Sequence, residues 1–255
     1  MAERTVGLLH PGEMGAAVGA VLHGRGHRVL WASDGRSAET RARAEAAALE
    51  DVGTATEVAR SEIVFSICPP HAALEVASSI GSFDGLYVDA NAVSPDTARK
   101  VAGIVRAGGG EPVDGGIVGS PPLEAGTTRL YLSGPRARGV LELFAGSILD
   151  ARVVSDQVGA ASAVKMAYAA WTKGTAAMLL AIRELARAEG VEPALLEEWG
   201  LSQSGLLERS ERAARSADAK GWRWVGEMEE IASTFEAAGL PGGFHRAAAE
   251  VYRAG

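Results

Sequence analysis

The chain has 255 residues, a formal net charge of −7 and a single cysteine, Cys68. The length allows one large domain or two modest ones, and the acidic balance argues against a nucleic-acid partner, because phosphate contacts need clustered lysine and arginine. One cysteine excludes a disulfide framework and favours a reducing compartment. No signal-like segment opens the sequence, and its longest strongly apolar stretch, residues 175–182, is too short for a bilayer. We therefore expect a cytoplasmic protein without nucleic-acid or membrane partners.

Residues 1–156 alternate short apolar runs with helix-like segments. The runs are typical of buried strands and the segments of amphipathic helices. This alternation predicts βαβ units and a mostly parallel sheet, that is, a Rossmann-type, doubly wound α/β domain. Strands are expected at 6–9, 29–31, 63–67, 86–89, 112–114, 129–132 and 152–154, and helices from 13 onward and at 37–49 (Ser37 as N-cap), 71–80, 95–107 and 138–144.

The pattern changes after residue 156, because no further β-rich run appears. One long helix is expected over 158–190, ended by Gly190. Shorter helices are expected at 193–201, 205–214, 224–238 and 243–252. The sequence therefore predicts two domains, an α/β domain over 1–156 and an all-helical domain over 157–255.

A tight turn follows the first expected strand. Residues 10–15 read His-Pro-Gly-Glu-Met-Gly, so Gly12 and Gly15 take the second and third positions of the G-x-G-x-x-G fingerprint, while His10 replaces the first glycine. Such a turn presents backbone N–H groups to a pyrophosphate, although it is equally compatible with a plain strand-to-helix turn. Other expected strand ends rich in glycine, proline or polar residues favour the dinucleotide, because ligands of parallel sheets bind at the carboxyl ends of the strands. These ends are 33–36, 68–70, 91–94 and 115–120.

The end of the second expected strand distinguishes the two nicotinamide dinucleotides. NAD sites carry an acid there for the ribose 2′-hydroxyl, whereas NADP sites offer cations to the 2′-phosphate. The acid position falls on Ser33, and Arg36 follows as a bidentate donor for phosphate. Asp34 argues the other way, and Arg36 is also compatible with a solvated residue at a helix start. We expect NADP, with NAD as the alternative.

Lys165 is an ionisable side chain among small and apolar residues of the long expected helix. It either extends to solvent or faces a cleft, where its pKa can fall so that it serves as an acid or a base. Helix periodicity alone favours the first alternative.

Two other polar features carry weaker signals. Glu227 lies in an acidic segment at an expected helix start, where the macrodipole already favours carboxylates. His23 and His27 have the spacing of a zinc-binding pair, but glycines between them break the helix that would align the two rings. We expect no metal site.

Together, these segments resemble the β-hydroxyacid dehydrogenase superfamily, which includes the 3-hydroxyisobutyrate and 6-phosphogluconate dehydrogenases and has the imine reductases as relatives. The resemblance covers nearly the whole chain, and its second half looks like an uncharacterised phosphogluconate-dehydrogenase-like branch. Lys165 falls where the family carries its catalytic lysine. The matching segments are 6–15 (G-x-x-G-x-G-x-M-G), 63–70 (a strand ending in proline), 88–95 (vD-x-S-T-x-x-P) and 113–127 (vDAPVSGG, then GT).

The resemblance implies an NAD(P)-dependent dehydrogenase or reductase. It would pass a hydride between the nicotinamide and a small hydroxy acid, carbonyl or imine, with Lys165 as general acid/base. It also implies a homodimer formed through the helical domain. The implied cofactor-binding residues are His10, Pro11, Gly12, Glu13, Met14, Ser33, Arg36, Cys68, Pro69, Pro70 and Asn91, and the implied substrate-binding residues are Val118, Gly119, Ser120, Ala169 and Glu227.

The sequence departs from the family at the groups that hold a substrate carboxylate. Asn91-Ala92 replaces Ser-Thr, Val118-Gly119-Ser120 replaces Ser-Gly-Gly, Ala169 replaces an asparagine, and Glu227 aligns with a second lysine of the family's helical domain. We expect such a site to bind a 3-hydroxy acid poorly, because its carboxylate would be desolvated without compensation. A Glu227 facing the cleft would favour a cationic or amine-bearing substrate. Two alternatives stay open: a catalytically silent dinucleotide-binding or sensing protein, and a decarboxylating dehydrogenase of a sugar acid.

Overall fold

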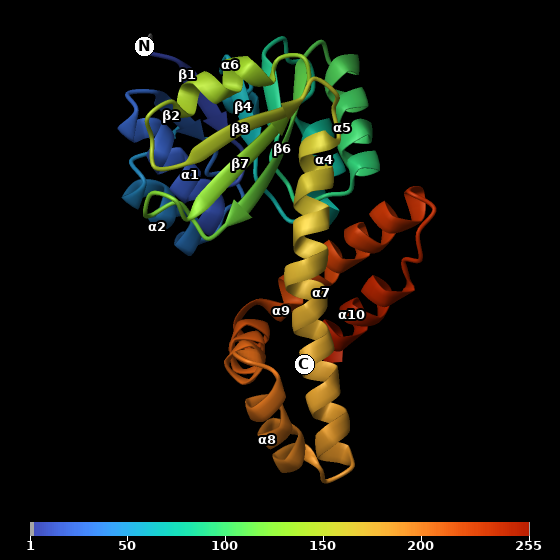
Figure 1. Ribbon diagram of the computed structural model, residues 1–255. Coiled ribbons are helices and arrows are strands. Elements are labelled where there is room, and N and C mark those ends of the chain that lie inside the picture. Colours follow the sequence, from blue (N-terminus) through green and yellow to red (C-terminus); the bar gives the residue numbers. More distant parts are fainter. Residues whose placement is uncertain (1–2, 255) are drawn as a thin grey trace. The chain divides into compact units, whose positions relative to one another are not determined.

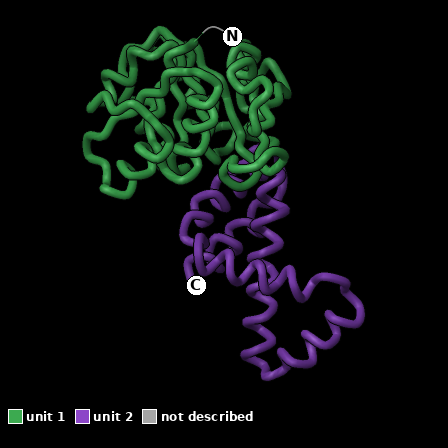
Figure 2. Tube along the Cα trace, turned by 90° about the vertical axis from the view of Figure 1, so that its left-hand side faces the viewer, with its two compact units in different colours: residues 1–165 green, residues 166–255 purple. Residues whose placement is uncertain are grey.

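The computed structural model describes residues 3–254. The chain forms two compact units, residues 1–165 and residues 166–255 (Figure 2). The first unit is a sheet covered by helices, and the second is helical (Figure 1). The predicted fold class is therefore confirmed. Each unit is described by itself.

An eight-stranded sheet forms the first unit. Its spatial order is β3-β2-β1-β4-β5-β6-β7-β8, and all neighbouring strands are parallel except the antiparallel pair β6 and β7. The strand order reverses at β1 and β4, which is the point where doubly wound sheets bind ligands. The strands are β1 (Thr5–Leu8), β2 (Arg28–Trp31), β3 (Glu50–Asp51), β4 (Ile63–Ser66), β5 (Leu86–Asp89), β6 (Glu111–Gly119), β7 (Thr128–Ser133) and β8 (Asp150–Ser155).

Both faces of this sheet are buried by helices. Ile63 and Phe65 of β4 belong to one apolar cluster, while Val64 between them belongs to a second cluster. Such alternation is expected of a strand covered on both sides. The predicted N-cap Ser37 is confirmed, since its Oγ accepts a hydrogen bond from the Thr40 backbone N–H (3.3 Å). The helices are α1 (Glu13–Gly24), α2 (Ala38–Ala46), α3 (Ala55–Val58), α4 (Ala73–Ser79), α5 (Pro95–Ala107) and α6 (Ala137–Leu141), with 3₁₀ turns η1 (Pro70–Ala72) and η2 (Glu142–Phe144).

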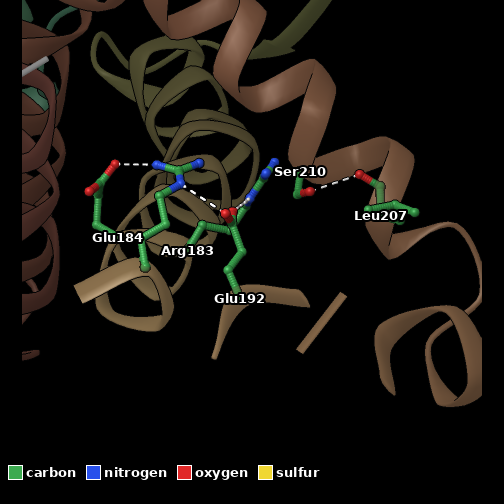
Figure 3. Close-up of polar contacts among 6 residues, drawn as sticks. Arg183, Glu184, Glu192, Leu207 and Ser210 are labelled. Atoms are coloured by element: carbon green, nitrogen blue, oxygen red, sulfur yellow. Dashed lines mark hydrogen bonds and ion pairs between the residues drawn. The ribbon is translucent and has the colours of Figure 1, made fainter. Parts of the chain in front are cut away.

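Four helices account for the rest of the chain: α7 (Ala160–Ala188), α8 (Glu192–Ser202), α9 (Leu206–Ala237) and α10 (Gly243–Ala254). As predicted, the long helix α7 stops just before Gly190, whose φ of +70° suits a glycine after a helix end. Glu192 then accepts hydrogen bonds from Arg183 (2.8 Å) and Arg187 (3.1 Å) and so ties α8 back to α7 (Figure 3). Within residues 3–254, no helix is both long and apolar enough to cross a membrane.

The structure corrects the expected end of β6. Residues 115–119 were expected beyond a short strand over 112–114, but they continue the strand and pair with β7. Glycines usually weaken a strand, yet here they allow α7 to approach the sheet. A Cβ on Gly116 would lie 2.6 Å from the Ala161 carbonyl oxygen and 2.9 Å from the Lys165 Cβ.

The structure also corrects the prediction of two helices over 205–214 and 224–238. Helix α9 runs through both, because the segment between them contains no proline. A single glycine costs a helix only about 1 kcal/mol, and Gly221 lies where a Cβ would be 3.6 Å from the Tyr252 ring. Packing of α10 against α9 therefore stabilises the continuous helix. The short elements β3 and α3 were not predicted.

Candidate functional site

The turn between β1 and α1 lies at the switch point of the sheet. A Cβ on Gly15 would overlap the His10 carbonyl oxygen, so this position requires glycine, whereas a Cβ on Gly12 would meet nothing within 4 Å. Gly12 is the N-cap of α1 and supplies no side-chain cap. The open space over Gly12 thus lies beside the uncapped start of a helix, an arrangement that suits a phosphate group.

His10 and Arg36 face this turn with unsatisfied polar atoms. The Arg36 Nη2 donates to the Leu9 carbonyl oxygen (3.4 Å). The Arg36 Nε and the His10 Nδ1 are buried, and neither has a hydrogen-bond partner among the described residues. Burial, helped by the Arg36 charge, lowers the pKa of His10 to about 4, so the imidazole is neutral at pH 7. An unpaired buried polar group costs about 1–3 kcal/mol, and a ligand that pairs with these atoms would remove that cost.

The carboxyl end of β2 is held by two groups that were not predicted. Arg41 Nη2 donates to the Ser33 carbonyl oxygen (2.8 Å). Asp51, at the end of β3, accepts from the backbone N–H groups of Ser33 (3.2 Å) and Gly53 (2.9 Å). Burial opposes ionisation of Asp51, but these hydrogen bonds hold its pKa below the usual value. Of the two nearby arginines, Arg41 thus contacts Ser33, while the Arg36 guanidinium contacts Leu9.

Asn91 joins the ends of β4 and β5. Its Oδ1 accepts from the Cys68 backbone N–H (2.6 Å), and its Nδ2 donates to the Ser66 Oγ (3.1 Å) and to Asp89. Both amide atoms are thus engaged with the chain, and the side chain is buried. Asn91 positions the segment Cys68-Pro69-Pro70 beside the switch point. Burial raises the pKa of the Cys68 thiol to about 11, so it is protonated.

Asp114 fixes the start of α7 and hence the turn that carries Lys165. Its buried carboxylate accepts from the backbone N–H groups of Gly159 (2.9 Å), Ala161 (3.0 Å) and Ser162 (3.1 Å). It also accepts from the Ser162 Oγ (2.6 Å) and the Ser133 Oγ (2.7 Å). A carboxylate at a helix N-terminus is favoured by the macrodipole. The backbone of the Lys165 turn is thus anchored to β6.

The remaining predicted residues of the first unit occupy diverse environments. Pro11 is buried, Glu13 is exposed, and Met14 packs on the sheet. Val118 is buried inside β6, so its side chain does not line an open site. Gly119 has a φ of +117°, which favours glycine, and the exposed Ser120 follows it.

Ala169 and Glu227 belong to the second unit. Ala169 is buried in α7. Glu227 of α9 forms an ion pair with Lys173 of α7, and both side chains are at most 16% exposed. Lys173 Nζ also lies 5.7 Å from the centroid of the Trp224 ring. The Glu227 charge is therefore compensated within the unit.

Sequence reasoning missed Arg41, Asp51, Asp114 and Lys173. A signal existed for Arg41, which follows the N-cap Ser37 by about one helical turn and so extends the basic group begun by Arg36. Lys173 is two helical turns after Lys165, a spacing that places both on neighbouring faces. Among residues 3–254, no three His, Cys, Asp or Glu side chains gather as metal ligands would.

Comparison with known proteins gives matches to each part of the chain. Residues 186–255 match a domain family of unknown function, DUF1932. An uncharacterised 28.5 kDa protein from the 7S RNA 5′ region of Methanothermus fervidus is 35% identical over 143 residues. That match spans 55% of this chain and only 54% of the relative, or about half of each.

Solved structures resemble nearly the whole chain. The conserved protein MTH1747, itself described as similar to 3-hydroxyacid dehydrogenases, is 27% identical with a TM-score of 0.71, covering 98% of this chain and 97% of its own. The 3-hydroxyisobutyrate dehydrogenase of Salmonella typhimurium has a TM-score of 0.75 at 17% identity (99% and 94% covered). A reductive aminase from Aspergillus terreus in complex with NADPH and ethyl levulinate has a TM-score of 0.63 at 20% identity, with the same coverage. Along nearly its whole length the chain thus has the fold of the β-hydroxyacid dehydrogenase superfamily, and the resemblance seen in its sequence is confirmed.

Proposed function

We propose that the chain is an NADP-preferring oxidoreductase that acts on a small carbonyl or imine, or on the corresponding hydroxy compound. The observation that carries the proposal is the set of unsatisfied groups at the switch point. The uncapped start of α1 has open space over Gly12, and the buried Arg36 Nε and His10 Nδ1 of the neighbouring segments have no hydrogen-bond partner among the described residues. A pyrophosphate supplies the acceptor oxygens that this set lacks.

The preference for NADP rests on the end of β2. The Arg41 guanidinium contacts the Ser33 carbonyl oxygen, and the Arg36 guanidinium contacts the Leu9 carbonyl oxygen after the neighbouring strand β1. Two guanidinium groups suit a 2′-phosphate. The nearby acid, Asp51, already accepts two backbone hydrogen bonds and is not left to bind a ribose hydroxyl alone.

The reaction follows from the cofactor class and from Lys165. When bound, the nicotinamide supplies or accepts the hydride. Lys165 would give a proton to the carbonyl oxygen or imine nitrogen during reduction, and would take it back during oxidation. The anchored start of α7 holds the backbone of this lysine in place. Solved structures of the same fold include a dehydrogenase and a reductase.

The absence of the family's carboxylate-binding residues narrows the class of substrate. The residues that would hold a carboxylate in the family are replaced here, which favours neutral substrates. Glu227 gives little support to a cationic substrate, because Lys173 already compensates its charge. Among the expected substrates, neutral ketones, aldehydes and imines therefore fit the residues of this chain best.

Cofactor binding and turnover test the proposal separately. NADPH and NADH affinities are measured by calorimetry for the wild-type chain and for Arg36→Gln, Arg41→Gln and Arg43→Gln. Both of the first two variants should bind NADPH at least tenfold more weakly. Arg41→Gln should leave NADH affinity little changed, whereas Arg36→Gln should weaken NADH as well, because its Nε is also assigned to the pyrophosphate. Arg43→Gln is the matched control, because this exposed arginine of α2 pairs with Glu39. Equal affinity of the wild-type chain for both dinucleotides would contradict the NADP preference.

Turnover is assayed with NADPH and a panel of ketones, aldehydes, cyclic imines and hydroxy acids. Lys165→Met should abolish turnover and keep NADPH binding. Tight NADPH binding by the wild-type chain with no turnover across the panel would favour the alternative of a catalytically silent dinucleotide-binding protein. That alternative draws its support from the replaced family residues at positions 91, 92 and 169.

We also propose that the helical unit forms a homodimer. Met178 and Leu185 are exposed apolar side chains on α7, seven residues apart and hence on one face of the helix. A second copy of the chain would bury this apolar face against the same face of its own α7, since two-fold symmetry is the commonest arrangement of homo-oligomers. Leu185→Glu should shift the sedimentation coefficient toward that of a monomer, whereas Leu123→Glu, an exposed leucine of the first unit, should not.

A further inference from the structure

A pocket of about 390 Å³ opens between α7 and α9 of the second unit. Trp171 and Trp224 form its aromatic walls, and Lys173, Arg209, Arg212 and Ser216 supply its polar lining. This volume is within the range of sites that hold small organic molecules. All of these residues belong to residues 166–255, whereas the proposed cofactor-binding residues belong to residues 1–165.

The pocket is cationic in a chain with a net charge of −7. It is lined by three basic residues and by no Asp or Glu. Lys173 is neutralised by Glu227, but in the described chain neither Arg209 nor Arg212 forms an ion pair with a carboxylate. On the same helix Arg215 does pair, with Glu211. Two like charges three residues apart destabilise a helix slightly, so the uncompensated pair has a cost that an anion would remove.

The aromatic walls favour a ligand in which a flat or apolar group is joined to the anionic group. The Arg209 Cζ lies 5.7 Å from the centroid of the Trp171 ring, and 60% of Trp171 is exposed. Stacking of an arginine on an aromatic ring keeps the guanidinium directed along the pocket wall. The exposed part of the indole remains available to an apolar group of a ligand.

The other polar groups of the lining leave the arginines as the main donors. The Thr172 and Thr175 hydroxyls already donate to the carbonyl oxygens of Tyr168 (3.2 Å) and Trp171 (2.6 Å). We propose that this pocket binds a small organic anion, whose carboxylate or phosphate is held by Arg209 and Arg212 and whose apolar body lies against Trp171. The ligand is distinct from the nicotinamide cofactor, and the site adds a second binding function to the chain.

Binding of defined probes to the full chain tests the proposal. The probes are 4-fluorobenzoate and phenyl phosphate, with the neutral 4-fluorobenzamide as control. Calorimetry follows all three, and ¹⁹F NMR follows the two fluorinated compounds. The two anions should bind saturably and the amide should not. The relative affinity of the two anions distinguishes a carboxylate site from a phosphate site.

Variants locate the binding. Arg212→Gln should weaken both anions at least tenfold, and Trp171→Leu should weaken them while leaving helix content unchanged by circular dichroism. Arg215→Gln is the matched control on the same helix and should have no effect. Arg36→Gln should also have no effect, which separates this pocket from the proposed cofactor site.

Several outcomes overturn the proposal. They are equal binding of the neutral amide, equal losses for Arg212→Gln and Arg215→Gln, and loss of binding only in Arg36→Gln. If no anion binds and Arg212→Gln shifts the sedimentation coefficient, a second copy of the chain covers the pocket, and the proposal is wrong.

Discussion

Replacement of Asp114 by asparagine tests how the sheet holds the start of α7. The carboxylate is buried and accepts five hydrogen bonds, two of them from backbone N–H groups of the first turn of α7 and one from the N–H of Gly159 just before the helix. Asparagine has nearly the same shape but carries no charge. It therefore keeps the packing and removes the charge.

The expected loss follows from these contacts. A hydrogen bond to a charged group contributes about 1.5–3 kcal/mol and one to a neutral group about 1 kcal/mol. An amide that turns its oxygen toward the three backbone donors weakens each bond by about 1 kcal/mol, and the interaction with the helix dipole falls as well. We expect Asp114→Asn to destabilise the start of α7 by about 3 kcal/mol.

Hydrogen exchange followed by mass spectrometry measures this effect locally. A loss of about 3 kcal/mol should speed exchange of the Ala161 and Ser162 amides by about 100-fold. Asp150→Asn is the control, because Asp150 pairs with Arg152 at the surface, where such pairs contribute at most about 1 kcal/mol. If the two variants exchange alike at these amides, Asp114 does not anchor α7 and the reasoning fails.

Three other expectations concern the turn at β1 and the helical unit. Since the pKa of His10 falls to about 4 on folding, the unfolded chain takes up the proton first, and about 2–3 kcal/mol of stability should disappear between pH 6.5 and pH 4. Urea titrations at pH 7 and pH 4.5 measure this loss, and His10→Gln should lessen it. An unchanged loss would assign it to other groups. Gly15→Ala should destabilise the first unit, because the added Cβ overlaps the His10 carbonyl oxygen. Gly12→Ala should fold normally and bind NADPH at least tenfold more weakly. Normal thermal stability of Gly15→Ala would refute the steric argument. Lys173→Met should cost up to about 3 kcal/mol in urea unfolding, since it leaves the partly buried Glu227 carboxylate without its partner. The double variant Lys173→Met/Glu227→Leu should recover most of this loss, and no recovery would mean that packing rather than charge sets the cost.

Features that depend on local backbone chemistry were predictable from the sequence. The N-cap at Ser37 and the helix end before Gly190 are confirmed. Each is set by a side chain or a φ value within a few residues of the element that it ends. The alternating apolar runs likewise predicted the mostly parallel sheet, because strands covered on both faces must be apolar throughout.

Features that depend on distant partners were not predictable. Asp114 meets α7 across 45 to 48 positions of the chain, and Lys173 meets Glu227 across 54. Gly116 resembled the end of a strand, because nothing near it in the sequence indicates the helix that packs against it. The turns of the candidate site could therefore be proposed from the sequence, whereas the contacts that support them required the fold.

The buried amide of Asn91 has a consequence for any attempt to restore hydroxy-acid chemistry in this chain. The family resemblance points to serine as the residue to reintroduce at position 91, but serine offers one short hydroxyl where Asn91 spans Cys68, Ser66 and Asp89. Replacing Asn91 with serine would remove the acceptor of the Cys68 backbone N–H and loosen the segment Cys68-Pro69-Pro70 beside the switch point. Specificity and architecture are thus coupled at one position, so that the serine of the family can be introduced only together with a compensating change at the end of β4.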